Sequence, residues 1–479
     1  MHPASANRSS TAWVVALTGL GSLMAALDTL VVATALGTIR LDLGASIEQL
    51  EWTVNAYNLS FAVLLIPAAA LGDRFGRRSA YAAGLTLFAT ASAACALAPT
   101  IGWLIAARTA QGAGAALLMP LALTLLSAAF PPERRGTAIG IFSAITGLAV
   151  ATGPLVGGAV VEGIAWQWIF WLNVPIGLAA ALLTLVRVPE SRGYDAGLDA
   201  PGLVLVAGGA LGLVWALVRG NAVGWGSTEV LAALAAGCAL LAAFVAWERR
   251  APSPMLPLAM FRSRAFSAGN VASFCTFGSL FALVFFFAQL MQVVLGYGPL
   301  AAGLRLMAWT ATFITVAPLA GTLADRFGER PFIVGGLGLQ AAGVAWLAAT
   351  VSTQTTYGGL IGPFVVAGVG ISMAIPGVQT SVMAAAAADR VGKAAGANSM
   401  MRELGGVFGI ALAVAAFAGA GGYASAATFV DGFVPALAVS AGLALAGAVS
   451  ALALPGRRAA PAAEPVGVVP VLEKEASAS

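Results

Sequence analysis

The sequence predicts an all-α membrane protein in which two pseudo-symmetric six-helix bundles flank an inserted two-helix hairpin. Three observations predict this fold. Hydrophobic residues make up 59% of the 479 residues and charged residues only 9%, whereas a soluble domain carries about 25% charged residues. The apolar residues form long continuous runs. One short motif occurs twice, 252 residues apart (325 − 73).

The apolar runs are long enough to cross a bilayer, which takes about 20 helical residues. They are continuous and do not alternate, which excludes membrane β-strands. The first run is too long for the apolar part of a cleaved signal peptide. About fourteen spans are predicted, near residues 12–36, 52–71, 79–98, 102–126, 137–160, 167–187, 200–219, 228–247, 267–292, 301–324, 331–349, 357–384, 397–420 and 434–455.

The basic residues predict the orientation of these spans. Of the 24 Lys and Arg residues, 19 fall in the N-terminal tail and the alternate loops on its side, two fall on the opposite side, and three lie within spans. Because cytoplasmic loops carry the excess of Lys and Arg, both termini are expected in the cytoplasm. The protein is therefore expected to be a multi-pass protein of the cell (inner) membrane.

The repeated motif predicts the domain organisation. Six spans with their loops would separate its two copies by roughly 200 residues, so the surplus of about 50 fits one extra helical pair. The expected parts are a cytoplasmic N-terminal tail, a first half, the inserted pair, a second half, and a disordered cytoplasmic tail. They cover residues 1–11, 12–187, 200–247, 267–455 and 456–479.

Composition also excludes several classes of function. No clustered basic, aromatic-interleaved surface suggests nucleic acid, and the three cysteines lie in apolar runs without metal-ligand spacing. No phosphate-binding loop, metal cluster or nucleophile–base pair is visible, so no cofactor, metal or enzymatic activity is expected. The only histidine is His2, so carboxylates would have to carry any transported proton. The expected partners are a small-molecule substrate, protons and the lipid bilayer, and the chain is expected to be a monomer.

Six short segments occur in a characteristic order. They are Leu27-Asp-Thr-Leu-Val-Val-Ala-Thr-Ala-Leu36, Trp52-Thr-Val-Asn-Ala-Tyr57, two Asp-Arg-x-Gly loops, Arg108-Thr-Ala-Gln-Gly-Ala-Gly114, Gly153-Pro-Leu-Val-Gly-Gly158 and Trp166-Gln-Trp-Ile-Phe-Trp-Leu-Asn-Val-Pro175. In these segments the chain resembles the major facilitator superfamily, and within it the fourteen-helix drug:proton antiporter family. The resemblance covers nearly the whole chain. Ala33 and Gly37 stand where that family often has Asn and Pro, so the substrate contacts of the first helix are expected to differ.

The resemblance implies roles for two sets of loop and helix residues. The Asp-Arg-x-Gly loops would act as gates that hold one conformation, although a basic loop that fixes orientation would look the same. The glycine-proline segment resembles the antiporter motif, although small residues also serve ordinary helix packing. The gating residues are Gly72, Asp73, Arg74, Gly76, Arg77, Asp325, Arg326 and Gly328, and the antiporter-motif residues are Gly153, Pro154, Gly157 and Gly158.

Charged residues inside spans are the candidates for proton coupling. A charge in mid-membrane costs about 2.5–3.5 kcal/mol on insertion scales, so it needs a partner or a wet cavity. Asp28, Arg108 and Glu403 are the candidates, and an ion pair between Asp28 and Arg108 that only supports the fold is the alternative. Polar residues in spans are expected to line the substrate cavity, namely Asn55, Asn58, Gln111, Gln289 and Gln379.

The predicted function is proton-coupled antiport that exports drugs, antibiotics or related small amphipathic molecules by alternating access. The alternative within the same fold is an importer or uniporter of a small metabolite. A membrane-embedded enzyme or receptor is disfavoured because no catalytic constellation is present. Self-resistance, multidrug efflux and metabolite export would give the same sequence features.

Overall fold

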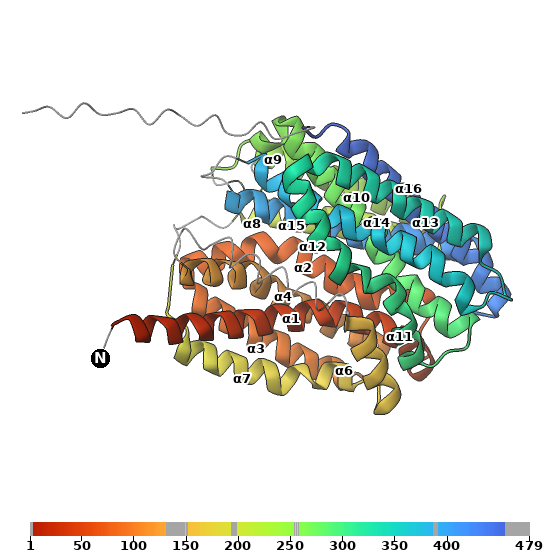
Figure 1. Cartoon of the computed structure of the whole chain (residues 1–479), viewed down its shortest axis with the longest axis horizontal. Helices are drawn as coiled ribbons and strands as arrows, with labels where there is room; N and C mark the ends of the chain where they lie inside the picture. Colours follow the sequence, from red (N-terminus) through yellow and green to blue (C-terminus); the bar gives the residue numbers. More distant parts are fainter. Residues whose placement is uncertain are drawn as a thin grey trace, which may run out of the picture.

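The computed structural model describes residues 3–130, 152–192, 199–252, 258–386 and 391–455, together with residues 149, 254 and 256. These residues form an aligned bundle of long helices and contain no β-strand (Figure 1). Among them, 12 helices are long and apolar enough to cross a membrane. The count reaches 13 if the two parts of α2, bent by 51°, form one further span. Thirteen of the fourteen predicted spans coincide with described helices, and the span near 137–160 lies largely outside the described residues.

The helices of the first 192 residues are α1 (Pro3–Leu43), α2 (Ile47–Phe75), α3 (Arg77–Ala96), α4 (Ile101–Ala129), α6 (Trp168–Trp171) and α7 (Asn173–Arg187), with a helical segment over 152–163. The start of α2 is fixed by a capping box. The Gln49 N–H donates to Ser46 Oγ at 3.3 Å, and the Ser46 N–H donates to Gln49 Oε1 at 2.9 Å. Such reciprocal bonds satisfy backbone donors that a helix start leaves free.

The later helices are α8 (Ala200–Val223), α9 (Thr228–Glu248), η2 (Leu258–Arg262), α10 (Arg264–Gln289), η3 (Leu290–Val294), α11 (Pro299–Thr310), α12 (Thr312–Phe327), α13 (Glu329–Thr350), α14 (Tyr357–Ala384), α15 (Val391–Ala420) and α16 (Ala426–Ala451). Helices α11 and α12 together make one predicted span, and so do α10 and η3.

One packing pattern occurs twice along the chain. Helix α2 packs on α4 as α12 packs on α14, and α3 packs on α4 and α7 as α13 packs on α14 and α16. Helix α1 packs on α4 and α7 as α10 packs on α14 and α16. The two sets lie on opposite sides of the bundle (Figure 1). The recurrence matches the sequence repeat, because related segments bury equivalent faces.

Helices α8 and α9 pack against each other, and α8 also contacts α2 and α15. Helix α8 therefore lies beside α2 of the first set and beside α15, which packs on α10 and α16 of the second set.

Both copies of the Asp-Arg-x-Gly motif join consecutive helices through one glycine. Gly76 has φ +111° between α2 and α3, and Gly328 has φ +88° between α12 and α13. Residues with side chains rarely adopt such positive φ values, so this turn requires glycine. Gly72 lies within α2, where it packs against Leu121 of α4. The end of the bundle that holds Asp73 and Asp325 is called the motif end, and the opposite end is called the distal end.

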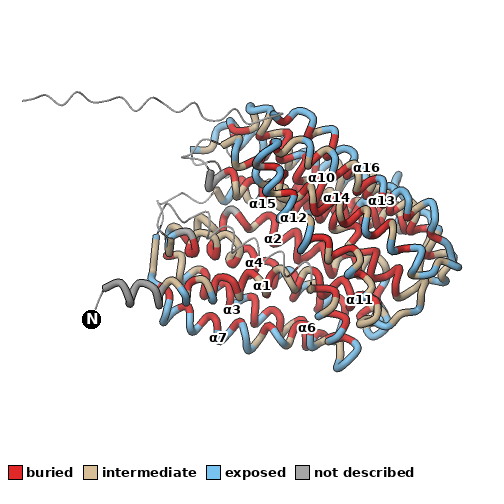
Figure 2. Tube along the Cα trace, viewed as in Figure 1, coloured by how far each residue is buried: buried red, intermediate tan, exposed pale blue. Residues whose placement is uncertain are grey.

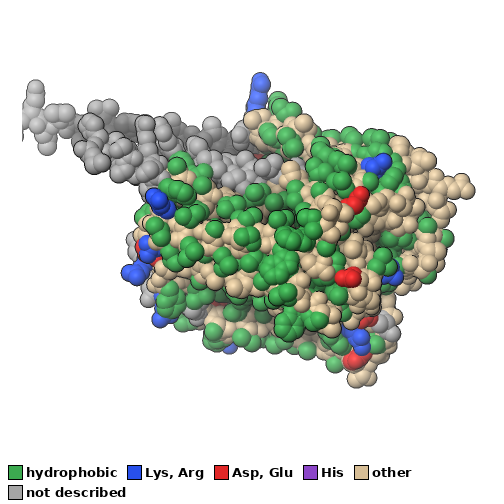
Figure 3. Space-filling view, turned by 90° about the horizontal axis from the view of Figure 1, so that it is seen from below, with side chains coloured by type: hydrophobic (Ala, Val, Ile, Leu, Met, Phe, Trp, Pro, Cys, Tyr) green, Lys and Arg blue, Asp and Glu red, His purple; other side chains and the backbone are tan. Residues whose placement is uncertain are grey.

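Large hydrophobic side chains cover the outside of the bundle as well as its inside. Leu182 and Val186, one turn apart on α7, are 68% and 77% exposed. Figure 2 shows buried backbone where helices face one another and exposed backbone around the rim, and Figure 3 shows a face that is mostly hydrophobic. Because soluble monomers rarely expose such large apolar areas, this surface is suited to lipid.

The glycine-proline segment contacts α11 at the distal end. A Cβ atom on Gly158 would lie 2.3 Å from the Pro299 carbonyl oxygen, and one on Gly303 would lie 2.2 Å from the Pro154 carbonyl oxygen. Glu162 Oε2 accepts a hydrogen bond of 2.9 Å from the Leu300 N–H at the start of α11. The two backbones touch because both helices carry glycine where they cross.

Replacing Gly158 should therefore separate the helices at the distal end. We expect Gly158→Leu to lengthen the distance between spin labels at Leu41→Cys and Leu304→Cys, measured by electron paramagnetic resonance after removal of the three native cysteines. Gly163→Leu is the matched control, because a side chain there would meet nothing within 4 Å. An unchanged distance in Gly158→Leu would contradict this packing.

Candidate functional site

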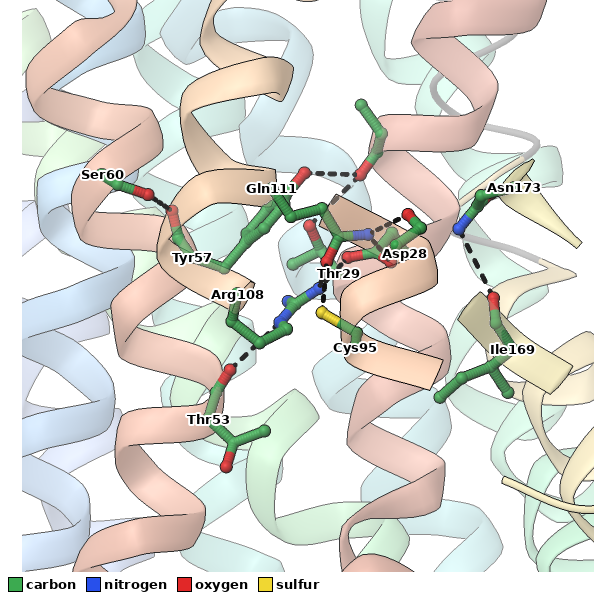
Figure 4. Close-up of polar contacts among 12 residues, drawn as sticks. Asp28, Thr29, Thr53, Tyr57, Ser60, Cys95, Arg108, Gln111, Ile169 and Asn173 are labelled. Carbon is green, nitrogen blue, oxygen red and sulfur yellow. Dashed lines mark hydrogen bonds and ion pairs between the residues drawn. The ribbon is translucent and has the colours of Figure 1, made fainter. Parts of the chain in front are cut away.

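An ion pair between Asp28 of α1 and Arg108 of α4 lies inside the first set of helices (Figure 4). Arg108 Nη1 contacts Asp28 Oδ2. The Arg108 side chain is 0% exposed and the Asp28 side chain is 1% exposed. Both residues were predicted as candidates for proton coupling, and the structure brings them together. The pairing that the sequence left open as an alternative is therefore present.

Gln111, one turn after Arg108, completes a closed network with the pair. Arg108 Nη1 donates to Gln111 Oε1 at 2.6 Å, and Gln111 Nε2 donates to Asp28 Oδ1 at 2.8 Å. Gln111 Nε2 also lies 2.8 Å from Ser92 Oγ of α3, and Arg108 Nε donates to the Thr53 carbonyl oxygen of α2 at 3.2 Å. The network thus joins α1, α2, α3 and α4. Figure 4 shows Asp28, Thr53, Arg108 and Gln111 close together.

Aromatic rings enclose the guanidinium group. Arg108 Cζ lies 4.2 Å from the centroid of the Tyr57 ring and 5.8 Å from that of Phe170. The Tyr57 hydroxyl donates to the Ala25 carbonyl oxygen at 3.2 Å, which fixes the ring against α1. Such rings stabilise a desolvated cation by about 2 kcal/mol.

One donor of the network is left over. Among the residues that the structure describes, Arg108 Nη2 is buried and has no hydrogen-bond partner. An unsatisfied buried donor costs about 1–3 kcal/mol, and more when it is charged. The pair is therefore held at a cost, which is typical of a site where a group is kept ready for another partner.

Glu403, the third predicted coupling residue, lies apart from this network. It is buried on α15, and no hydrogen bond or ion pair joins it to Asp28 or Arg108 within the described parts of the chain. Its neighbour Arg402 points its guanidinium over the Phe277 ring at 4.2 Å. No ion pair joins Arg402 and Glu403 among the described residues, because neighbouring helix positions face different directions.

The polar residues predicted to line a cavity fall into different surroundings. Gln111 belongs to the ion-pair network. Gln289 is buried and accepts a hydrogen bond from the Tyr423 hydroxyl, while Gln379 is half-buried. Asn55 and Asn58 are fully buried on α2. Asn55 Oδ1 and both amide atoms of Asn58 have no hydrogen-bond partner among the described residues, so these two amides are open to a further partner.

The first Asp-Arg-x-Gly loop is held by a residue that the sequence did not single out. Asp73 lies in the last turn of α2 and pairs with Arg77 at 2.7 Å, so its carboxylate does not cap α3. Glu190, after α7, supplies the cap: its carboxylate accepts from the Arg78 N–H at 2.9 Å and the Ser79 N–H at 3.3 Å. A carboxylate at this helix start also meets the positive end of the dipole.

Hydrogen bonding keeps the Glu190 carboxylate ionised. Partial burial alone raises its pKa, but hydrogen bonds from the Ser79 hydroxyl and neighbouring backbone N–H groups hold the pKa below its ordinary value.

In the second copy of the loop, Arg326 is exposed and its guanidinium lies 5.5 Å from the centroid of the Phe327 ring.

A buried carboxylate near the distal end was also missed. Glu51 is 1% exposed on α2, but the predicted span began at residue 52 and left it in a loop. The capping box at Ser46 and Gln49 is readable in the sequence and places the helix start at Ile47. That signal would have put Glu51 inside the span.

Comparison with known proteins supports the family resemblance that the sequence motifs suggested. The model of the Major Facilitator Superfamily matches residues 18–410. The chain is 37% identical over 399 residues to the tetracenomycin C resistance and export protein of Streptomyces glaucescens, covering 82% of this chain and 73% of that one. It is 34% identical over 465 residues to the puromycin resistance protein of Streptomyces alboniger, covering 92% and 91%.

Solved structures show a similar fold at low sequence identity. A D-xylose–proton symporter aligns with a TM-score of 0.66 and 17% identity over 93% of this chain and 98% of that one. A bacterial homologue of the lysosomal transporter Spinster, in an inward-facing and unoccupied conformation, aligns with a TM-score of 0.64 and 16% identity over 93% and 97%. These likenesses concern the fold alone.

The ion pair should show strong energetic coupling. Removing one partner of a buried pair costs about 3–5 kcal/mol, because it leaves the other charge uncompensated. We expect Asp28→Asn and Arg108→Gln each to destabilise the purified protein, and the double variant to lose at least about 1 kcal/mol less than the sum. Equilibrium unfolding in detergent measures this cycle, and additive losses would count against the pair.

Glu190→Gln should loosen the start of α3. We expect faster hydrogen–deuterium exchange at Arg78 and Ser79 at pH 7, because a neutral amide is a weaker acceptor than a carboxylate. Since the folded pKa is lowered, the protection in the unsubstituted protein should be complete above the ordinary pKa of about 4.3. It should be lost as pH falls through the lowered value. Equal exchange in both proteins at pH 7 would exclude this cap.

Proposed function

We propose that this chain, which belongs to the major facilitator superfamily, is a proton-coupled antiporter that exports drugs, antibiotics or related small amphipathic molecules. The observation that carries the proposal is the buried Asp28–Arg108–Gln111 network, because it places a carboxylate inside a membrane bundle. The two relatives described above are named as resistance or export proteins, which favours export over import.

The proposal includes the arrangement in the membrane. We infer fourteen spans, with the span near 137–160 completing the first six-helix half at residues 12–187. Residues 267–455 form the second half, and the α8–α9 pair is the insertion at 200–247. The excess of basic residues at the motif end supports a cytoplasmic position for that end and for both termini. The chain would act as a monomeric carrier and not as an enzyme.

In this orientation the described arrangement is the one closed to the outside. Three contacts between the halves support this inference, and all lie at the distal end. Gln292 Nε2 donates to the Thr34 carbonyl oxygen at 3.0 Å, the Leu300 N–H donates to Glu162, and Arg40 lies 4.5 Å from the centroid of the Tyr423 ring. Alternating access requires these contacts to break when the distal end opens.

Proton coupling would follow from the charge balance of the network. With Asp28 ionised, Arg108 is neutralised and the four helices are held together. A proton that binds Asp28 from the outside removes this neutralisation, so Arg108 must find other acceptors, such as Gln111 Oε1 and the Thr53 carbonyl oxygen. A cationic substrate at Asp28 would compete with the proton for the same charge, and this competition couples their opposite movements.

Glu403 is proposed as a second proton-accepting residue in the other half, since a lone buried carboxylate is costly unless it binds a proton or a cation. Asn55, Asn58, Gln111, Gln289 and Gln379 are proposed to contact substrate. The two Asp-Arg-x-Gly loops are proposed as the gates of the motif end, and Gly153, Pro154, Gly157 and Gly158 as the segment on which the distal end closes.

Everted membrane vesicles test this function. We expect a respiratory pH gradient to be partly dissipated when a substrate such as ethidium is added, and ethidium uptake to stop with an uncoupler. Asp28→Asn should lower proton-coupled uptake at least about tenfold, because a missing carboxylate removes a site made for the proton. Asp431→Asn is the matched control, because Asp431 is exposed on α16. Uptake that is insensitive to the uncoupler would overturn the proposal.

A further inference from the structure

A cavity of about 520 Å³ lies at the distal end of the molecule, between the end of α1, the start of α2, α8 and α15. Its polar lining includes Arg40, Glu48, Glu51, Asn221 and Tyr423. This set shares no residue with the Asp28 network, which is built from α1, α2, α3 and α4. The cavity is therefore a separate concave site, and its volume falls within the range of small-molecule pockets.

Glu51 is the unusual group in this lining. Its side chain is buried, and its Oε1 accepts one hydrogen bond of 3.2 Å from Asn55 Nδ2. Throughout the described chain, no Lys or Arg lies within ion-pair distance of it. The positive dipole end of α2 favours a carboxylate here, but that effect is smaller than the cost of burying an unpaired charge. The Glu51 carboxylate thus has no basic side chain among the described residues to balance its charge.

The nearby cations are already engaged elsewhere. Arg40 lies over the Tyr423 ring. Arg219, at the end of α8, pairs with Glu48 at 3.4 Å and with Glu229 at 3.8 Å. Of the two carboxylates that line the cavity, Glu48 therefore has an ion-pair partner and Glu51 has none among the described residues. A ligand that supplies the missing partner of Glu51 carries a single positive charge.

Apart from Ser46, the remaining lining is apolar. Ile47, Val218 and Val414 face the cavity, together with alanines of α15. An inorganic cation would meet too few oxygen ligands among such side chains. A molecule with a cationic centre and an apolar body would instead bury its hydrocarbon against them while its charge faces Glu51.

We propose that the distal cavity is a second ligand site, which binds amphipathic monovalent organic cations through Glu51. Under the proposed orientation this site faces the outside, where an exported molecule leaves or an external cation enters. The site does not depend on the Asp28 network, so it can exist whether or not the transport mechanism proposed above is correct.

Equilibrium binding of radiolabelled tetraphenylphosphonium to purified protein tests the site. This cation has an apolar body and no dissociable proton, so its binding does not require proton exchange. We expect saturable binding that is weakened at least about tenfold by Glu51→Gln. The matched control Glu229→Gln, at the same end but outside the cavity lining, should bind within about twofold of the unsubstituted protein.

Two further variants keep the test decisive. Ala418→Trp fills the cavity without changing Glu51 and should also abolish the Glu51-dependent binding. Asp28→Asn should retain it, even if that variant no longer transports, which separates this site from the central network. Binding that is unaffected by both Glu51→Gln and Ala418→Trp in folded protein, or that is lost only in Asp28→Asn, would overturn the proposal.

Discussion

The structure depends on one buried ion pair, between Asp28 and Arg108, in a bundle whose interior is mostly apolar. Neither side chain could remain in this position alone, because a lone buried charge costs several kcal/mol. The pair is satisfied only because four helices approach it. Helix α1 brings the carboxylate, α4 brings Arg108 and Gln111, α2 offers the Thr53 carbonyl oxygen, and α3 offers Ser92. The position of these helices and the charge state of Asp28 are therefore linked.

Glycine determines where the helices can meet and where they can turn. Gly158 and Gly303 allow the two halves to touch at the distal end, and Gly76 and Gly328 allow matching turns at the motif end. Small-residue contacts of this kind can open and close without moving long side chains. Under the proposed alternating access, the glycine contacts at the distal end would separate while the polar network around Asp28 stays together.

Much of this could be predicted from the sequence. Continuous apolar runs predicted the helices, since in lipid every backbone group must be satisfied within a helix. The cost of a charge in a span singled out Asp28 and Arg108 before any contact was known. The sequence could not predict Glu190 as the partner of the motif loop, because that contact joins residues 112 positions apart. Glu51 was missed because the helix start was taken from hydropathy and not from its capping box.

The central claim is that Asp28 is where proton and substrate compete. Proton release from purified protein on substrate binding tests it most directly, with a pH-indicator dye in weakly buffered detergent solution. If proton and substrate compete for Asp28, substrate releases protons from the unsubstituted protein, and Asp28→Asn, still binding substrate, releases none. Equal proton release from the two proteins would contradict it.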